Sequence, residues 1–454
     1  MSDLKMTRRC ALSLLGAGAA GGAAWWALDR AGLLRALDAD ADDPNPGQVL
    51  RRPFVRDPSR EISLLGYGGI RLPTLHRSDR EMDLELGAKL VAFAMRHGIN
   101  YFDTGWVYHK GEGEKFWGAL LPKYDRAKYF LGDKMCTWEL KSLDEAKKMF
   151  QTQLDKCRTP YFDHYFLHSL GSEAQYRKVY HEYGALKYLD EERAKGRLKY
   201  LGFSFHGKKD FLKRLLDERK WDFVMIVFNA LEYDRGNHVK DLYELIAASK
   251  TPVFVMEPLG GGRLARFNGP ARATIEAAAP GRSAASWALR FAASFPAVQT
   301  ILSGMGRLDH LRENIETLST DFKPLTKPEM DTYWKAIGEF RKFPGIPCTG
   351  CRYCVPCPYG VEIPEVFAWW NSFAGAGRLP SDTGPNDSQE LRREFLASYS
   401  NAIAPGCGPE KCIRCKKCQV ACPQWTFRIS TEMEKIDRFI RDTRAAYLAK
   451  GGRL

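Results

Sequence analysis

Three features common in other protein classes are missing from this chain. No Gly-x-Gly-x-x-Gly turn follows the first predicted strand, which disfavours a doubly wound dinucleotide-binding sheet. No basic block is interleaved with aromatic residues, so we expect no nucleic-acid partner. Cysteines are scarce before residue 348, where only Cys10, Cys136 and Cys157 occur, and this excludes a chain-wide disulfide network.

The composition is that of a folded protein with a basic surface. Among 454 residues, 44% are hydrophobic and 12% are aromatic, enough to bury a sizeable core. The formal net charge is +13, which favours acidic partners or an anionic cofactor.

The N-terminal segment resembles a bacterial twin-arginine export signal. Arg8 and Arg9 precede an apolar stretch rich in Gly and Ala, and Ala39-Asp40-Ala41 offers a small-x-small cleavage site. We therefore interpret residues 1–41 as a signal peptide and 42–59 as a linker, and we expect twin-arginine export machinery as a partner and a periplasmic location. A membrane anchor formed by an uncleaved signal, and a cytoplasmic protein with a chance Arg-Arg pair, are the alternatives.

Residues 60–340 alternate eight times between short apolar runs and longer segments of helical period. This pattern is typical of βαβ units and predicts a (β/α)₈ TIM barrel, an α/β fold. The clearest helices are predicted over Met82 to His97 and Tyr176 to Lys195. The eight strands are predicted near Ser63–Tyr67, Asn100–Asp103, Tyr129–Lys134, Asp163–Leu167, Tyr200–Phe203, Phe223–Val227, Val253–Met256 and Gln299–Leu302.

Four polar residues follow or end three of these strands, where the active sites of such barrels lie. They are Asp103, Tyr108, Lys134 and His168. Each alone could be structural, but together they suit proton donation to a carbonyl oxygen. We expect the Lys134 ammonium to lower the pKa of Tyr108, Asp103 to keep Lys134 charged, and His168 to orient the substrate. None of the four supplies a hydride, so the two-electron chemistry requires a cofactor, and a nicotinamide is the obvious one for carbonyl reduction or alcohol oxidation.

Two cysteine runs indicate a metal-binding domain over residues 341–454. Their spacings are C-x₂-C-x₂-C-x₂-C-P and C-x₂-C-x₂-C-x₃-C-P, and the second matches bacterial ferredoxins. We predict a small ferredoxin-like domain with two [4Fe-4S] clusters. Zinc and disulfides are the weaker alternatives, and Cys407 is a ninth candidate ligand. The ferredoxin pattern would pair Cys348, Cys351 and Cys354 with Cys422, and Cys412, Cys415 and Cys418 with Cys357.

Four segments carry a resemblance to the aldo/keto reductases, and with the cysteine runs to their iron-sulfur branch. They are Glu61-Ile-Ser-Leu-Leu-Gly-Tyr-Gly-Gly-Ile-Arg-Leu-Pro73, Gly98-Ile-Asn-Tyr-Phe-Asp-Thr-Gly-Trp-Val-Tyr108, Asp163-His-Tyr-Phe-Leu-His168 and Val298-Gln-Thr-Ile-Leu-Ser-Gly-Met305. The resemblance covers about residues 60–425 and implies that the four polar residues are the family's tetrad, with Tyr108 as general acid/base.

The same resemblance implies an NADP(H) or NAD(H) site. Its residues would be Ser204, Gly260, Gly261, Gly262, Leu264, Ser303, Gly304, Met305, His310, Glu313 and Asn314. Phe205 and Met225 depart from the family, which often has Asn and Gln there to hold the carboxamide. Gly304 and His310 stand where many relatives have Lys and Arg, which weakens the preference for NADP.

Three functions are compatible with these features. The leading one is an exported oxidoreductase that interconverts a carbonyl and an alcohol on a small substrate such as a sugar-like molecule. The second is an iron-sulfur electron-transfer protein with a non-catalytic barrel, and the third is a small-ligand binding protein. Residues 401–454 hold 11 Lys/Arg and 5 Asp/Glu, a net +6, which suits an acidic redox partner. A nicotinamide moves two electrons and each cluster one, so the clusters either are structural or exchange electrons by another step.

Overall fold

The computed structural model describes residues 45–75, 80–234, 239–267, 269–342, 345–422 and 427–453. The predicted export signal and its cleavage site lie outside the described residues.

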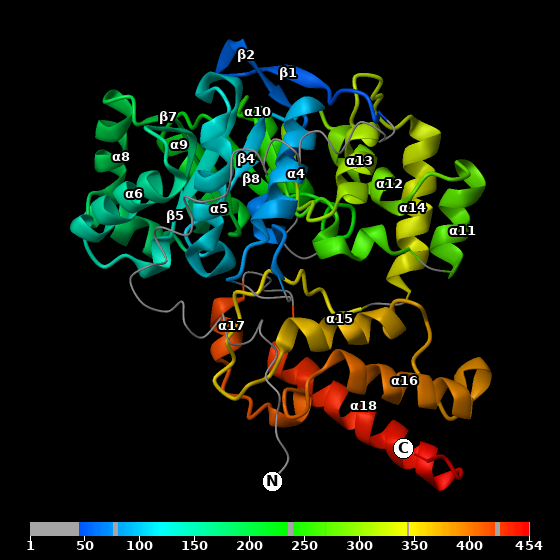
Figure 1. Ribbon diagram of the computed structural model, residues 1–454. Coiled ribbons are helices and arrows are strands. Elements are labelled where there is room, and N and C mark those ends of the chain that lie inside the picture. The colour runs from blue at the N-terminus through cyan, green and yellow to red at the C-terminus, as the bar shows by residue number, and fades with distance from the viewer. Residues whose placement is uncertain are drawn as a thin grey trace.

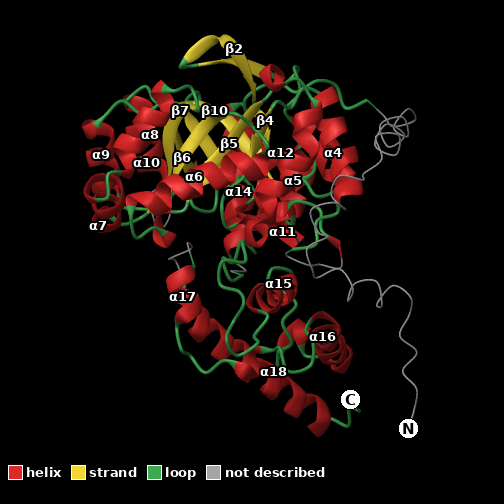
Figure 2. Cartoon of the chain, turned by 60° about the vertical axis from the view of Figure 1, so that its left-hand side comes forward, coloured by secondary structure: helices red, strands yellow, loops and turns green. Residues whose placement is uncertain are grey.

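Eight parallel strands close a barrel in the order β10-β3-β4-β5-β6-β7-β8-β9. All eight predicted strands are confirmed within a few residues, because each is a short apolar run that is buried on both faces. The strands are β3 (Leu65–Tyr67), β4 (Tyr101–Asp103), β5 (Phe130–Met135), β6 (Phe162–Leu170), β7 (Leu198–Phe205), β8 (Val224–Val227), β9 (Val253–Met256) and β10 (Val298–Ser303). Figure 2 shows this barrel surrounded by helices.

The helices that cover the barrel are α4 (Leu84–Arg96), α5 (Glu112–Leu120), α6 (Leu143–Cys157), α7 (Glu173–Tyr176), α8 (Ala185–Ala194), α9 (Lys209–Glu218), α10 (Val239–Ala248), α11 (Gly269–Ala278), α12 (Ala284–Ala293), α13 (Leu308–Thr317) and α14 (Lys327–Arg341). The Met82 to His97 helix is confirmed as α4, with Asp83 as its N-cap. The prediction of one helix over Tyr176 to Lys195 was wrong, because Gly184, at φ +79°, interrupts it before α8. None of the helices in the described ranges is long and apolar enough to span a bilayer.

A two-stranded hairpin covers the end of the barrel where the strands begin. It consists of β1 (Arg51–Phe54) and β2 (Asp57–Ser63), so the prediction of a linker over 42–59 was wrong for its second half. The Phe54 ring is fully buried, 5.1 Å from the ring of His164 and 4.7 Å from that of Tyr200. The hairpin therefore closes this end with an aromatic plug.

The C-terminal domain lies at the opposite end of the barrel from the hairpin (Figure 1). It contains α15 (Ile363–Ala374), α16 (Gln389–Ala402), α17 (Lys417–Ala421) and α18 (Ile429–Ala449), packed around their own apolar core. Between residues 345 and 453, no strand forms among the residues that are described. The framework is helical, and the likeness to ferredoxins rests on the cysteine loops alone.

Candidate active site

The four predicted tetrad residues come together at the carboxyl ends of the strands. Asp103 ends β4, Lys134 lies in β5, His168 lies in β6, and Tyr108 begins the short turn after β4. All four side chains are buried. The Lys134 ammonium forms an ion pair with Asp103 and also donates a hydrogen bond to the carbonyl oxygen of Thr104.

Lys134 lies directly beneath the phenol of Tyr108. Its Nζ atom is 4.7 Å from the centre of the Tyr108 ring, and its positive charge favours the ionised form of the phenol. The turn that carries Tyr108 is tight, because the next two residues, His109 and Lys110, both have positive φ. The backbone therefore fixes the phenol against the ammonium.

The pKa of Tyr108 differs from the prediction that the Lys134 ammonium would lower it below its ordinary value. Burial raises this pKa above its ordinary value, and the nearby Lys134 charge only partly offsets that effect. Burial alone would lower the pKa of Lys134, but Asp103 and Tyr108 raise it overall, so the ammonium stays charged. At neutral pH the site therefore holds a protonated phenol above a charged ammonium.

His168 is neutral, and both His168 and Tyr108 interact with Tyr353. Burial, together with the Lys134 charge, lowers the pKa of His168 well below its ordinary value. Its Nε2 atom lies 3.4 Å from the hydroxyl oxygen of Tyr353, and Tyr353 also interacts electrostatically with Tyr108. Tyr353 lies between Cys351 and Cys354 in the C-terminal domain, so a second domain reaches the tetrad. Sequence reasoning missed this residue.

A cavity of about 510 Å³, here called the barrel cavity, extends from the tetrad across the barrel mouth. Eight of the eleven predicted cofactor residues line it, namely Ser204, Gly261, Gly262, Ser303, Gly304, His310, Glu313 and Asn314. Gly260, Leu264 and Met305 do not, and all three are buried. Met305 instead fixes its loop, because its carbonyl oxygen accepts a 2.6 Å hydrogen bond from Tyr67.

The glycine loop after β9 packs against the C-terminal domain. Gly260, Gly261 and Gly262 all have positive φ, which side chains rarely adopt. A Cβ atom on Gly261 would lie 2.3 Å from Cα of Thr349, so only glycine permits this approach. Arg71, which lines the barrel cavity, donates a hydrogen bond to the carbonyl oxygen of Thr349. The cysteine loop thus covers part of the cavity.

The residues of the barrel cavity fit a nicotinamide dinucleotide. Arg71, Arg266 and His310 supply positive charge or hydrogen-bond donors for an anionic diphosphate. Within the tetrad, Asp103 Oδ2 and His168 Nδ1 are buried without a hydrogen-bond partner in the described part of the chain. Near the carboxamide position, Ser204 Oγ accepts a 2.7 Å hydrogen bond from the Ser169 amide. Met225 lines the cavity next to it and offers only an apolar surface.

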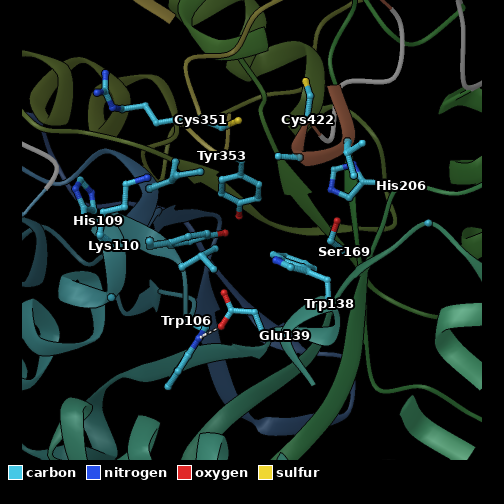
Figure 3. A pocket seen from close by; sticks show the side chains of 18 of the residues that line it. Trp106, His109, Lys110, Trp138, Glu139, Ser169, His206, Cys351, Tyr353 and Cys422 are labelled. Atoms are coloured by element: carbon cyan, nitrogen blue, oxygen red, sulfur yellow. Dashed lines mark hydrogen bonds between the residues drawn. The ribbon is translucent and has the colours of Figure 1, made fainter. Parts of the chain in front are cut away.

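A larger cleft of about 1220 Å³, here called the outer cleft, lies between the barrel and the C-terminal domain. It meets the barrel cavity at Tyr108 and Tyr353, which line both. Figure 3 shows Trp138, Tyr353 and His206 bordering the outer cleft. In the same view the Trp106 indole donates a hydrogen bond to Glu139, of length 2.6 Å. The outer cleft therefore leads from solvent to the tetrad.

The cysteines form two sets of four. Each set lines its own cavity of about 20 Å³. The first contains Cys348, Cys351, Cys354 and Cys422, and the second contains Cys357, Cys412, Cys415 and Cys418. Cys407 lines neither cavity. In the described ranges, no three His, Cys, Asp or Glu side chains are arranged to hold a single metal ion.

The comparisons with known proteins concern the barrel. The aldo/keto reductase family profile matches residues 64–337. An uncharacterized oxidoreductase, YqkF, of Bacillus subtilis (strain 168) is 23% identical over 300 residues, which cover 60% of this chain and 91% of that protein.

Two solved structures share the barrel fold. Aldo-keto reductase AKR11C1 from Bacillus halodurans, in its holo form, has a TM-score of 0.52 and 21% identity, covering 64% of this chain and 96% of its own. An aldo-keto reductase from Klebsiella pneumoniae in complex with NADPH has a TM-score of 0.50 and 18% identity, covering 63% of this chain and 94% of its own.

Proposed function

This chain belongs to the aldo/keto reductase family and is an oxidoreductase, and from that premise we propose that it interconverts a carbonyl and an alcohol with bound NADP(H) or NAD(H). One observation carries the proposal. The hydroxyl oxygen of Tyr353 lies 3.4 Å from Nε2 of His168 and interacts electrostatically with the phenol of Tyr108, while Lys134, ion-paired with Asp103, lies against that phenol. A substrate carbonyl oxygen in that position would meet the same two groups.

The residues divide the work of carbonyl reduction. Tyr108 donates its phenolic proton to the substrate oxygen, and the Lys134 ammonium stabilises the phenolate that remains. Asp103 keeps that ammonium charged, and neutral His168 orients the oxygen through Nε2. The nicotinamide supplies the hydride when bound. In alcohol oxidation Tyr108 acts as the base.

Glycine loops and basic side chains support the cofactor assignment. Gly262, whose Cβ position is open, would let the backbone approach the dinucleotide, with Arg71 and Arg266 near its phosphates. The NADPH complex of the Klebsiella pneumoniae protein is in line with this assignment. Because Thr349 lies over Gly261, we expect the cofactor to be held tightly and to remain bound during purification.

Two [4Fe-4S] clusters are the second part of the proposal. The first set of cysteines would bind one cluster and the second set the other. Four thiolates of a zinc site lie about 3.8 Å apart around one ion, given a Zn–S distance of about 2.3 Å. The four thiolates that bind a [4Fe-4S] cubane lie farther apart than those of a zinc site. This wider spacing suits cysteine sulfurs that surround a cavity without converging on one point. The basic C-terminal segment would meet an acidic redox partner.

Export by the twin-arginine route is the third part. Such export carries folded proteins, so clusters and nicotinamide could be inserted before the chain reaches the periplasm. Replacing Arg8 and Arg9 by Lys should leave the protein in the cytoplasmic fraction, whereas the wild type should be recovered from the periplasm with residue 42 near its N-terminus. Wild type that stays in the membrane or the cytoplasm would contradict this part.

One experiment tests the enzyme and the clusters together. Protein purified without oxygen is analysed for iron, sulfide, zinc, nicotinamide and flavin, and assayed for carbonyl reduction. We expect about eight iron atoms per chain, from two clusters of four. Cys351→Ser should lower the iron content, whereas Cys407→Ser should not. Clusters without nicotinamide or turnover would favour an electron-transfer protein. This outcome is worth testing because Phe205 and Met225 are apolar where the family often holds the carboxamide with Asn and Gln. Nicotinamide and ligand binding without turnover would favour a binding protein.

A further inference from the structure

The outer cleft is too large for a simple aldehyde. Pockets for drug-sized ligands measure roughly 300–1,000 Å³, whereas this cleft measures about 1220 Å³ and opens directly on Tyr108. Its walls come from both domains, since Arg352, Lys417 and Val420 of the C-terminal domain line it. The substrate it suits is extended beyond its reacting carbonyl.

The cleft carries a strong excess of positive charge. Its single carboxylate is Glu139, which is held by the Trp106 indole. Its six cationic side chains are Arg80, Lys110, Lys156, Lys208, Arg352 and Lys417.

Two of these cations are available to a ligand. Lys156 pairs with Glu114 and Arg352 pairs with Glu365. In contrast, the side chains of Lys208 and Lys417 are exposed and form no ion pair or hydrogen bond within the described residues. Lys208 precedes α9 of the barrel and Lys417 begins α17, so the two domains each present one ammonium to the cleft.

An aromatic face lies next to the reacting atoms. The Trp138 side chain is 42% exposed, and its ring centre lies 5.0 Å from that of His168 and 6.2 Å from that of Tyr353. Ser172 and Gln175 add hydrogen-bonding groups to the same cleft. An open indole face surrounded by polar side chains suits the C–H face of a sugar ring, whose hydroxyl groups then reach the polar groups.

We propose that the outer cleft binds an anionic sugar, with a carboxylate or phosphate near Lys208 and Lys417 and its open-chain carbonyl at Tyr108. This inference rests on the proposed function, because it names the substrate class of the same tetrad. The C-terminal domain thereby contributes to substrate recognition, since it supplies Lys417 and Tyr353.

The test compares matched substrates with the protein as purified. Glucuronate and glucose 6-phosphate carry the two anionic groups, and glucose is their neutral counterpart. We expect kcat/KM for at least one anionic sugar to exceed that for glucose tenfold or more, and the preference to shrink in high salt because exposed charges are screened. The double variant Lys208→Ala with Lys417→Ala should lose about tenfold on the anionic sugar and leave glucose unchanged. Lys209→Ala, which changes an exposed neighbour that pairs with Asp241, should have no effect.

Several outcomes would overturn this inference while leaving the proposed function intact. They are equal or faster turnover of glucose, and reduction of benzaldehyde with no reduction of any sugar. Calorimetric titration of glucuronate separates the two proposals. Binding that the double variant loses, in a protein that reduces no carbonyl, would support the cleft assignment and contradict the enzyme.

Discussion

The hydroxyl oxygen of Tyr353 lies 3.4 Å from Nε2 of His168, although 185 positions separate the two residues in the sequence. The same side chain interacts electrostatically with Tyr108. Because Cys351 and Cys354 flank Tyr353, the cysteine loop and the tetrad are joined through one side chain. The Tyr353 hydroxyl therefore competes with a substrate oxygen for contact with Tyr108 and His168.

Tyr353→Phe tests that competition. Removing the hydroxyl should lower KM several-fold and leave kcat within about twofold, because Tyr108 and His168 then have no internal partner to release. Steady-state kinetics give both constants. Tyr359→Phe, at an exposed position on the same cysteine loop, is the control and should match the wild type. A tenfold fall in kcat at constant KM would instead mean that Tyr353 orients Tyr108 during turnover.

Tyr108→Phe should abolish proton donation with little effect on binding. We expect kcat to fall at least 10²-fold, the lower end of general acid catalysis, and bound nicotinamide to be retained. Burial raises the pKa of Tyr108, so wild-type carbonyl reduction should stay constant from about pH 6 to 9 and fall only as the phenol ionises at higher pH. A loss of reduction between pH 7 and 9 would show that the phenol ionises earlier than its burial implies.

Phe54→Ala tests the aromatic plug. The substitution should lower the free energy of unfolding by about 3–5 kcal/mol, because it leaves a cavity among buried rings. Denaturant unfolding measures this loss. Val55→Ala, at a neighbouring side chain that is 54% exposed, should change stability by less than about 0.5 kcal/mol. Since the plug lies at the end of the barrel away from Tyr108, folded Phe54→Ala protein should keep its kcat.

Because His164 is buried, we predict that the free energy of unfolding falls in acid. Burial lowers the pKa of this side chain to about 3, whereas an unfolded histidine has a pKa of about 6.5. The unfolded chain therefore binds a proton that the folded protein does not, and stability is lost as pH falls from about 6.5 toward 3. Replacing His164 by Phe should remove about 1.4 kcal/mol of pH dependence per unit in that window. Denaturant unfolding at pH 7 and pH 5 measures this difference, and parallel curves for wild type and variant would contradict it.

Local sequence determined the barrel and the composition of its tetrad. Each strand is a short apolar run between helical segments, and each tetrad residue stands at or just after such a run. The spacing of these runs was therefore sufficient to predict the barrel and its four site residues. The cysteine spacing likewise indicated how the cysteines group, because in the ferredoxin pattern the last cysteine of each run joins the set of the other run, as Cys357 and Cys422 do.

The tertiary structure decided what depends on contacts between distant segments. The aromatic hairpin looked like a linker, because its strands are short and their partner, the barrel floor, is built from residues far along the chain. Leu264 and Met305 lie on cofactor loops by position, yet they face the core. The entry of Tyr353 into the active site depends on how the C-terminal domain docks on Gly261, and no local pattern reports the packing of one domain against another.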